Sequence, residues 1–241
     1  MADTLLDIQH VTKRFGGFNA LTDVNLSVQA GERLGLIGPN GSGKTTLINC
    51  ISGVLRNDAG VIRFNGRDIT TMPAHKRTRL GIVRSFQIPK PFMSMSVLEN
   101  LCTPLEYAAH HDAHHTDIAP QAMAILDRIG LAAKAHEPPT GLTQVEMRKL
   151  ELARAIAAKP TLLISDEAMA GLSSGEVDDI LALLMQLNQQ GITIIMIEHI
   201  MRAVMRFSER IVVLDAGEKI AEGTPEDVVN NKAVEKAYLG E

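Results

Sequence analysis

The chain has 241 residues, 45% of them hydrophobic and 22% charged, which is ordinary for a globular protein with an ample core. Its formal net charge of −4 gives no electrostatic reason to expect a nucleic-acid partner. Cys50 and Cys102 lack metal-type spacing, so a reducing compartment is expected. The acidic start MADTLLDIQH is unlike a signal peptide, and apolar runs such as 192–197 are too short to cross a bilayer. Any membrane role is therefore expected to come through partners.

The first elements are strands. Residues 5–15 and 24–28 alternate apolar with polar side chains, which predicts half-exposed antiparallel strands. Residues 33–37 (RLGLI) predict a short buried strand, and residues 44–52 predict a helix that ends before Gly53.

Between that strand and that helix stands GPNGSGKTT, residues 38–46, which fits the P-loop pattern G-x-x-x-x-G-K-[ST]. In this motif successive backbone N–H groups surround a diphosphate, the lysine reaches the β- and γ-phosphates, and the Ser/Thr hydroxyl binds Mg²⁺. The helix that follows points its positive end at the anion. The sequence predicts a nucleoside triphosphate site made by Gly38, Pro39, Asn40, Gly41, Ser42, Gly43, Lys44, Thr45 and Thr46.

Strands, a short helix and then a group of longer helices are expected after the P-loop helix. Residues 60–64 and 67–69 flank Asn65-Gly66 and predict a hairpin. Residues 73–80 predict a short basic helix, and residues 81–86 predict a strand that ends on Gln87, before Pro89 and Pro91 break regular structure. Helical spacing then predicts an inserted helical subdomain with helices at 96–108, 118–129 and 143–157.

Four histidines lie inside that insert, in the segment 110–115 (HHDAHH). Closely spaced imidazoles can bind a transition metal. A solvated polar loop is the favoured interpretation, because the segment lies in the most linker-like part of the insert.

The last third returns to strands that alternate with helices, which predicts a mostly parallel sheet covered on both faces. Strands are expected at 161–165, 192–197, 210–214 and 218–221, and helices at 175–189, 200–207 and 225–238.

Two acids follow the strand at 161–165. Asp166 is expected to hold Mg²⁺, and Glu167 to orient and polarise an attacking water. The alternative is a helix-capping pair of acids. Gln87 and His199 also follow core strands; alone each is an ordinary polar end residue, but together the four could meet at one rim around the γ-phosphate.

This order of motifs resembles the ATP-binding cassette (ABC) transporter ATPases over essentially the whole chain. It is most similar to the ATP-binding subunits of branched-chain amino acid importers. The stretches that carry the resemblance are KRFGGFNAL (13–21), GIVRSFQ (81–87), LTQVEMRKLELARA (142–155), AMAGLSS (168–174), IEHIMRAVM (197–205) and a terminal AYLGE.

The resemblance implies further roles. Phe15 matches the aromatic residue that stacks on adenine, and Gln87 lies in the loop that touches Mg²⁺ and faces the membrane subunits. Residues 170–173 match the loop that crosses the dimer interface, and His199 matches the switch histidine at the γ-phosphate. Glu167, His199 and Gln87 are thus the expected catalytic residues, and Thr45, Gln87 and Asp166 the expected metal ligands.

One motif departs from the family. The signature LSGGQ, which binds the γ-phosphate held by the other subunit, here reads Leu142-Thr143-Gln144-Val145-Glu146. Val145 replaces a glycine, and Glu146 replaces a neutral amide with a charge. If Glu146 faces phosphate, two unit charges about 4 Å apart repel by about 4 kcal/mol at an effective dielectric near 20. Ser165 and Ala168 are milder departures.

The expected fold is therefore α/β: a P-loop NTPase (RecA-like) core with an antiparallel β subdomain and an inserted α-helical subdomain. One ABC ATPase domain spans 1–241, with the core at 1–90 and 160–241 and the helical subdomain at 91–159.

The expected function is ATP binding and hydrolysis, with Mg²⁺, in an importer of branched-chain amino acids or related small solutes. The alternative is a regulatory or structural cassette with little hydrolysis; a cassette for nucleic-acid repair or translation is disfavoured. The resemblance implies permease subunits, a periplasmic solute-binding protein and a second cassette as partners. A heterodimer is favoured over a homodimer, at the cytoplasmic face of the membrane.

Overall fold

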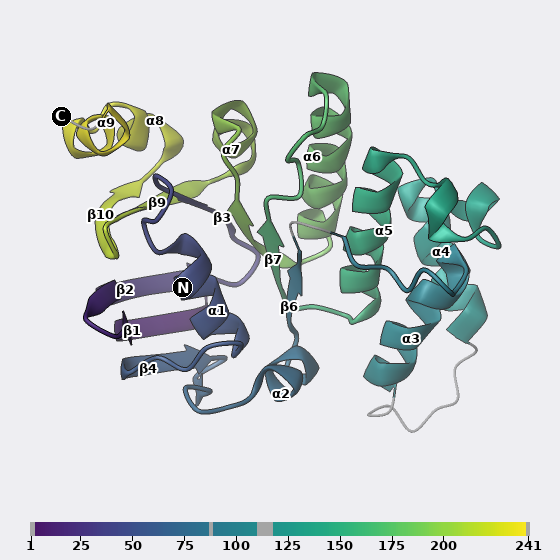
Figure 1. Ribbon diagram of the computed structural model, residues 1–241, viewed down its shortest axis with the longest axis horizontal. Helices are drawn as coiled ribbons and strands as arrows, with labels where there is room; N and C mark the ends of the chain where they lie inside the picture. The colour runs from purple at the N-terminus through teal and green to yellow at the C-terminus, as the bar shows by residue number, and fades with distance from the viewer. Residues whose placement is uncertain (1–2, 87–88, 110–117, 240–241) are drawn as a thin grey trace.

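The computed structural model describes residues 3–86, 89–109 and 118–239. Its strands form two sheets, a four-stranded antiparallel sheet and a six-stranded, mainly parallel one (Figure 1). The predicted α/β class is confirmed.

The antiparallel sheet is built by the alternating segments near the N-terminus. Its strand order is β2-β1-β4-β5, and all three pairings are antiparallel. Leu6 and Ile8 point to the buried side of β1, as the alternation predicts. The strands are β1 (Thr4–Phe15), β2 (Phe18–Gln29), β4 (Ala59–Phe64) and β5 (Arg67–Asp68).

The larger sheet has the order β10-β9-β3-β8-β7-β6. Neighbouring strands from β9 to β6 are parallel, and only β10 runs antiparallel, against β9. The carboxyl ends of β3, β6, β7 and β8 therefore lie at one edge, where the loops that follow them can meet. The strands are β10 (Glu218–Gly223), β9 (Arg210–Asp215), β3 (Arg33–Ile37), β8 (Thr193–Ile197), β7 (Leu162–Asp166) and β6 (Ile82–Ser85).

Helices cover both faces of this sheet. Strand β7 shows the division, because Leu162 and Ile164 belong to the core beneath α1 whereas Leu163 belongs to the core beneath α6. On the α1 side the antiparallel sheet shares the same core. The helices of this part are α1 (Lys44–Ser52), α2 (Ala74–Arg79), α6 (Ser174–Gln189), α7 (Met201–Phe207), α8 (Pro225–Val229) and α9 (Lys232–Leu239).

Three further helices gather at one end of the molecule, opposite α8 and α9 (Figure 1). They are α3 (Val97–Ala109), α4 (Ile118–Ile129) and α5 (Gln144–Ala157), with short 3₁₀ turns at Ala132–Lys134 and Pro139–Gly141. Leu126 of α4 and Leu150 of α5 are fully buried in the same apolar cluster as Leu184 of α6. The helical part is thus joined to the sheet by one continuous core. Its separation at 91–159 as a subdomain stays a prediction.

The C-terminal tail differs from its prediction. The sequence indicated one helix over 225–238, but the chain forms two, α8 and α9. The reason is local: Asn230 ends α8, and the Asn231 side chain accepts a hydrogen bond from the Ala233 backbone N–H (2.9 Å) at the start of α9. None of the helices that the structure describes is long and apolar enough to cross a membrane.

Candidate nucleotide site

The P-loop leaves the carboxyl end of β3 and enters α1, as the motif requires. Gly38 has φ +148°, and a Cβ there would lie 2.0 Å from the Leu214 carbonyl oxygen. Gly43 has φ +103°, and a Cβ there would lie 2.7 Å from the Ala20 carbonyl oxygen. Both positions demand glycine for conformation and for space, which lets the backbone curl around an anion.

Lys44 is 7% exposed and lies inside this loop. Its Nζ donates hydrogen bonds to the carbonyls of Gly38 (2.7 Å) and Pro39 (2.9 Å) and to Ser42 Oγ (3.4 Å). Burial lowers the pKa of Lys44, while the carboxylates of Glu167 and Asp166 act in the opposite direction. The lysine thus sits as a buried positive charge, with its ammonium held at the place where the loop would receive phosphate oxygens.

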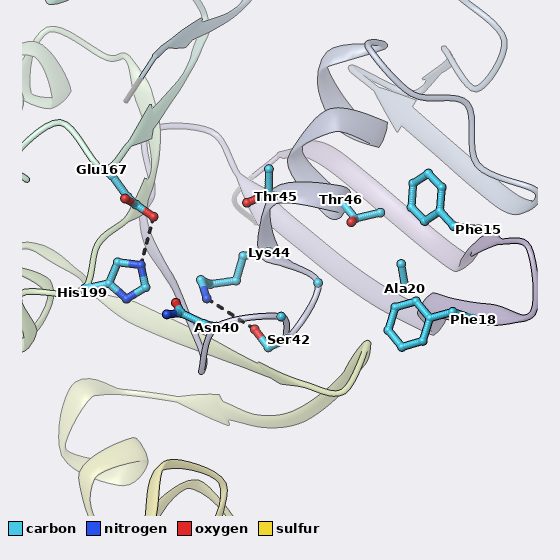
Figure 2. Close-up of a pocket in the computed structure, with 12 residues that line it drawn as sticks. Phe15, Phe18, Ala20, Asn40, Ser42, Lys44, Thr45, Thr46, Glu167 and His199 are labelled. Atoms are coloured by element: carbon cyan, nitrogen blue, oxygen red, sulfur yellow. Dashed lines mark hydrogen bonds and ion pairs between the residues drawn. The ribbon is translucent and has the colours of Figure 1, made fainter. Parts of the chain in front are cut away.

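The loop forms one wall of a cavity of about 290 Å³. Figure 2 shows Phe15 and Phe18 at one end of this cavity, Glu167 and His199 at the other, and Lys44 between them. Phe15 and Phe18 are 48% and 61% exposed, so their rings are accessible to a flat ligand, and Lys13 Nζ lies over the Phe15 ring, 5.4 Å from its centroid. The remaining lining residues are Ala20, Asn40, Gly41, Ser42, Gly43, Thr45 and Thr46.

The far end of the cavity holds a paired acid and imidazole. His199 Nε2 lies 2.9 Å from Glu167 Oε1, and the two side chains follow β8 and β7 (Figure 2). Glu167 has φ +48°, and its backbone N–H donates to the Ile197 carbonyl (2.9 Å). A left-handed backbone at a non-glycine residue is rare and costs about 1–3 kcal/mol, and such strain clusters at functional sites. Glu167 and His199 line one cavity with the P-loop, and the convergence of all four strand-end residues on a γ-phosphate stays a prediction.

Asp166 ends β7, is 7% exposed and binds an arginine. Arg84 of β6 lies 2.5 Å from Asp166 Oδ2 through Nη2, and its Nη1 donates to Asn49 Oδ1 (2.6 Å) in α1. Asp166 is thus held beside the P-loop helix by a cation within this chain. Gln87 lies outside the described residues, and its predicted place at the rim stays a prediction.

The degenerate signature has a local structure that differs from the expected repulsion between Glu146 and a phosphate. Thr143 caps α5: its hydroxyl accepts from the Glu146 N–H (3.3 Å), and Glu146 Oε2 accepts from the Thr143 N–H (2.8 Å). Lys134 Nζ lies 2.7 Å from the same carboxylate oxygen. These contacts, that of Lys134 first, lower the pKa of Glu146. The assumption that Glu146 points freely toward a phosphate is therefore wrong for this chain, since its carboxylate turns back onto its own helix.

Sequence reasoning missed Arg84 and Phe18. A charged residue inside the apolar run of β6 was the available signal for Arg84, and an aromatic after Gly16-Gly17 was the signal for Phe18. The histidine segment 110–115 lies outside the described residues. Within the described ranges, no group of three or more His, Cys, Asp or Glu side chains could hold a metal ion by itself.

Comparison with known proteins agrees with this geometry. Residues 21–170 match the family model described as ABC transporter, and residues 218–241 match one described as branched-chain amino acid ATP-binding cassette transporter. The chain is 36% identical to the high-affinity branched-chain amino acid transport ATP-binding protein BraF of Pseudomonas aeruginosa, over all of both chains. It is 38% identical to a probable branched-chain amino acid transport protein, LivG, of Archaeoglobus fulgidus, over 98% of this chain and 95% of that protein.

Solved structures show the same fold. A nucleotide-free ATP-binding cassette of an ABC transporter matches with a TM-score of 0.89 at 33% identity, over 99% of this chain and 100% of that one. The ADP conformation of such a cassette matches with the same TM-score and identity. The comparisons favour the transport ATPase over the regulatory alternative. The P-loop, the full-length relatives and the fold place this chain in the ABC transporter family, as an ATP-binding cassette of its ATPase subunits.

Proposed function

We propose that this cassette hydrolyses ATP to power the import of branched-chain amino acids, or related small solutes, through membrane permease subunits. The observation that carries the proposal is similarity over the full length, down to the C-terminal segment 218–241, to proteins named for branched-chain amino acid transport. In this role the chain is peripheral at the cytoplasmic face of the membrane, and the solute arrives on a periplasmic binding protein.

In this proposal the cavity orients ATP along its length. Phe15 stacks on the adenine ring, with Phe18 beside it, and the N–H groups of the P-loop and Lys44 hold the phosphates. Glu167 then orients and polarises the attacking water, and His199 holds the Glu167 carboxylate in place and contacts the γ-phosphate.

Magnesium fits the residues present. Thr45 offers a hydroxyl and Asp166 a carboxylate, both oxygen donors of the kind Mg²⁺ prefers, and Gln87 is the third proposed ligand. The ion would neutralise phosphate charge. Because Arg84 occupies an Asp166 oxygen, the metal is expected to bind through the other oxygen or through water.

The assembly proposed is a heterodimer with a second cassette. A signature receives the partner's γ-phosphate at the N-terminus of its helix. Here that N-terminus is already bound by its own capping box and carries the Glu146 carboxylate, which is paired with Lys134. Two copies of this chain would place such a signature over both nucleotides. A partner with an intact signature would complete this chain's P-loop site. A related cassette, 26% identical with a TM-score of 0.82, has been solved as a dimer bound to ADP and phosphate.

Uptake of labelled leucine tests the transport proposal directly. The chain is co-expressed with the proposed permease, binding-protein and second cassette subunits in cells without their own leucine uptake. Wild type is expected to restore uptake, and Glu167→Gln to lose it, while Glu209→Gln, an exposed carboxylate beside Arg33, serves as the matched control. A panel of competing amino acids, amides and organic acids ranks the solutes. Equal uptake with Glu167→Gln would contradict the proposal.

A further inference from the structure

The turn that follows the catalytic strand, residues 168–172, is held from two sides. We propose that Glu198 and Arg148 are positioning residues for ATP hydrolysis, which clamp this turn between the end of β8 and helix α5 and so fix the geometry of Glu167 and His199. The inference rests on the proposed roles of Glu167 and His199. It concerns two buried charged side chains that stand behind the nucleotide cavity.

Glu198 supplies the first side of the clamp. It is 2% exposed, and its Oε1 accepts a hydrogen bond from the Met169 backbone N–H (2.8 Å). Burying a carboxylate costs several kcal/mol of desolvation unless hydrogen bonds offset it, so packing alone does not explain a glutamate at this position. Because Glu198 immediately precedes His199, the bond ties the strand end that carries the imidazole to the turn that follows Glu167.

Helix α5 supplies the second side. Arg148 is 8% exposed, and its Nη2 donates to the Ala170 carbonyl oxygen (3.3 Å). One turn earlier in the same helix, Gln144 Nε2 approaches the same oxygen at 3.5 Å. Next to it, a Cβ on Gly171 would lie only 2.7 Å from that amide nitrogen. The start of α5 thus rests directly on the turn.

Charge complementarity joins the two sides. Arg148 interacts electrostatically with Glu198, Glu151 and Glu167, and Glu198 with Glu167 and Arg148. Neither Glu198 nor Arg148 is among the described residues that line the nucleotide cavity. Both stand behind the cavity and bond to the turn beside Glu167, so their loss should disturb the reacting groups and spare ATP affinity.

The clamp has a mechanical consequence for the dimer. Gln144 belongs to the signature sequence 142–146, which in the proposed assembly faces the nucleotide of the partner. The same helix therefore contacts the catalytic turn of its own chain and the ATP held by the other subunit. A shift of α5 on binding that ATP would move residues 168–172, and with them Glu167 and His199.

Amide exchange and kinetics test the clamp together. In Glu198→Leu the Met169 N–H loses its acceptor, so its hydrogen exchange should accelerate roughly tenfold, with the Leu55 N–H, which donates to the Asn49 carbonyl (2.9 Å) away from the turn, as internal reference. In Glu198→Gln an acceptor oxygen remains, and exchange should stay near wild type. For ATP turnover of the chain mixed with the proposed second cassette, Glu198→Leu is expected to lower kcat at least about tenfold with KM within about twofold, and Glu198→Gln to keep most of kcat.

Two further variants, Arg148→Met and Gln144→Ala, remove the contacts from α5 to the turn. Gln144 is exposed, so its replacement does not threaten the fold. Arg148→Met should lower kcat, and together with Glu198→Leu the loss should be smaller than the product of the two, because both act on one turn. Glu209→Gln is the control. Unchanged Met169 exchange in Glu198→Leu would overturn the clamp, and changed exchange with unchanged kcat would overturn its role in hydrolysis. Absence of ATP turnover in the wild-type complex with the second cassette would instead refute the proposed function, while the exchange result would still report on the clamp.

Discussion

At the scale of single residues, the cavity separates binding from chemistry. Lys44 lies in the middle of the cavity, and Glu167 lies at its far end, beside His199. We expect Lys44→Ala to weaken ATP binding at least about tenfold, since it removes a charge-assisted contact to phosphate. Glu167→Gln should keep ATP affinity and lower turnover between about a hundredfold and ten-thousandfold. Glutamine keeps the shape of the side chain but cannot act as the proposed general base. Equilibrium binding of a fluorescent ATP analogue and steady-state phosphate release separate the two. Equal ATP affinity in wild type and Lys44→Ala would refute the pocket.

Glu198 gives the chain a pH-dependent stability. Burial raises the pKa of Glu198 from its ordinary 4.5 to about 7, and Glu167 raises it too, against the opposing effect of the Met169 and His199 backbone N–H groups and Arg148. An acid whose pKa is raised on folding stabilises the fold below pH 4.5 and loses that contribution as pH rises through 7. The loss is about 3 kcal/mol at most.

Urea denaturation at pH 5, 6, 7 and 8 measures this slope. Wild type should lose stability as pH rises across the range, and Glu198→Gln should show a clearly flatter dependence, since it cannot ionise. Glu209→Gln, whose native residue is an exposed partner of Arg33, should keep the wild-type slope. The same slope in Glu198→Gln as in wild type would mean that another group titrates.

At the scale of elements, α5 also reaches the segment after β6. Arg154 Nη1 donates to the Lys90 carbonyl (2.7 Å), its guanidinium lies 5.0 Å from the Phe92 ring centroid, and Glu151 pairs with it (3.0 Å). Phe92, Met93 and Met95 are 42%, 50% and 37% exposed. Clustered exposed apolar side chains on a loop suit a protein partner.

We therefore expect a permease subunit to dock at residues 92–95. A cysteine placed at Met93 should cross-link to a co-expressed permease, whereas one at Val229, which is 60% exposed on α8 at the opposite end of the molecule, should not. Arg154→Met should weaken the coupling of ATP turnover to the permease more than basal turnover. Absence of cross-links from every position in 92–95 would count against the transport proposal as a whole.

The elements also show how far the sequence could lead. The bounds of β3 and α1 were predictable, because a motif with strict geometry separates them. The break between α8 and α9 needed attention to the side chains of Asn230 and Asn231 rather than to periodicity. Thr143 and Glu146, three residues apart, form a capping box that the sequence contained but that the family signature obscured. The Arg84–Asp166 pair could not be predicted, because it depends on which strands are neighbours in the sheet.

At the scale of the whole molecule, one chain carries two unequal halves of the catalytic arrangement. Its own P-loop site brings Lys44, Glu167 and His199 together around one cavity. In the proposed heterodimer, its contribution to the partner's site is the helix start at Thr143, which is bound by its own capping hydrogen bonds. The proposed heterodimer, with one complete and one weak ATP site, is the arrangement that uses both features.

Steady-state ATPase at saturating ATP, for the chain alone and mixed with the proposed second cassette, tests this arrangement. Val145→Gly with Glu146→Gln restores the glycine and the amide of the signature and removes the partner of Lys134. We expect this double change to accelerate the chain alone far more than the mixed complex, whose competent site uses the other signature. An unmodified chain that alone turns over at about 1–100 s⁻¹, the usual range for phosphoryl transfer, would contradict it.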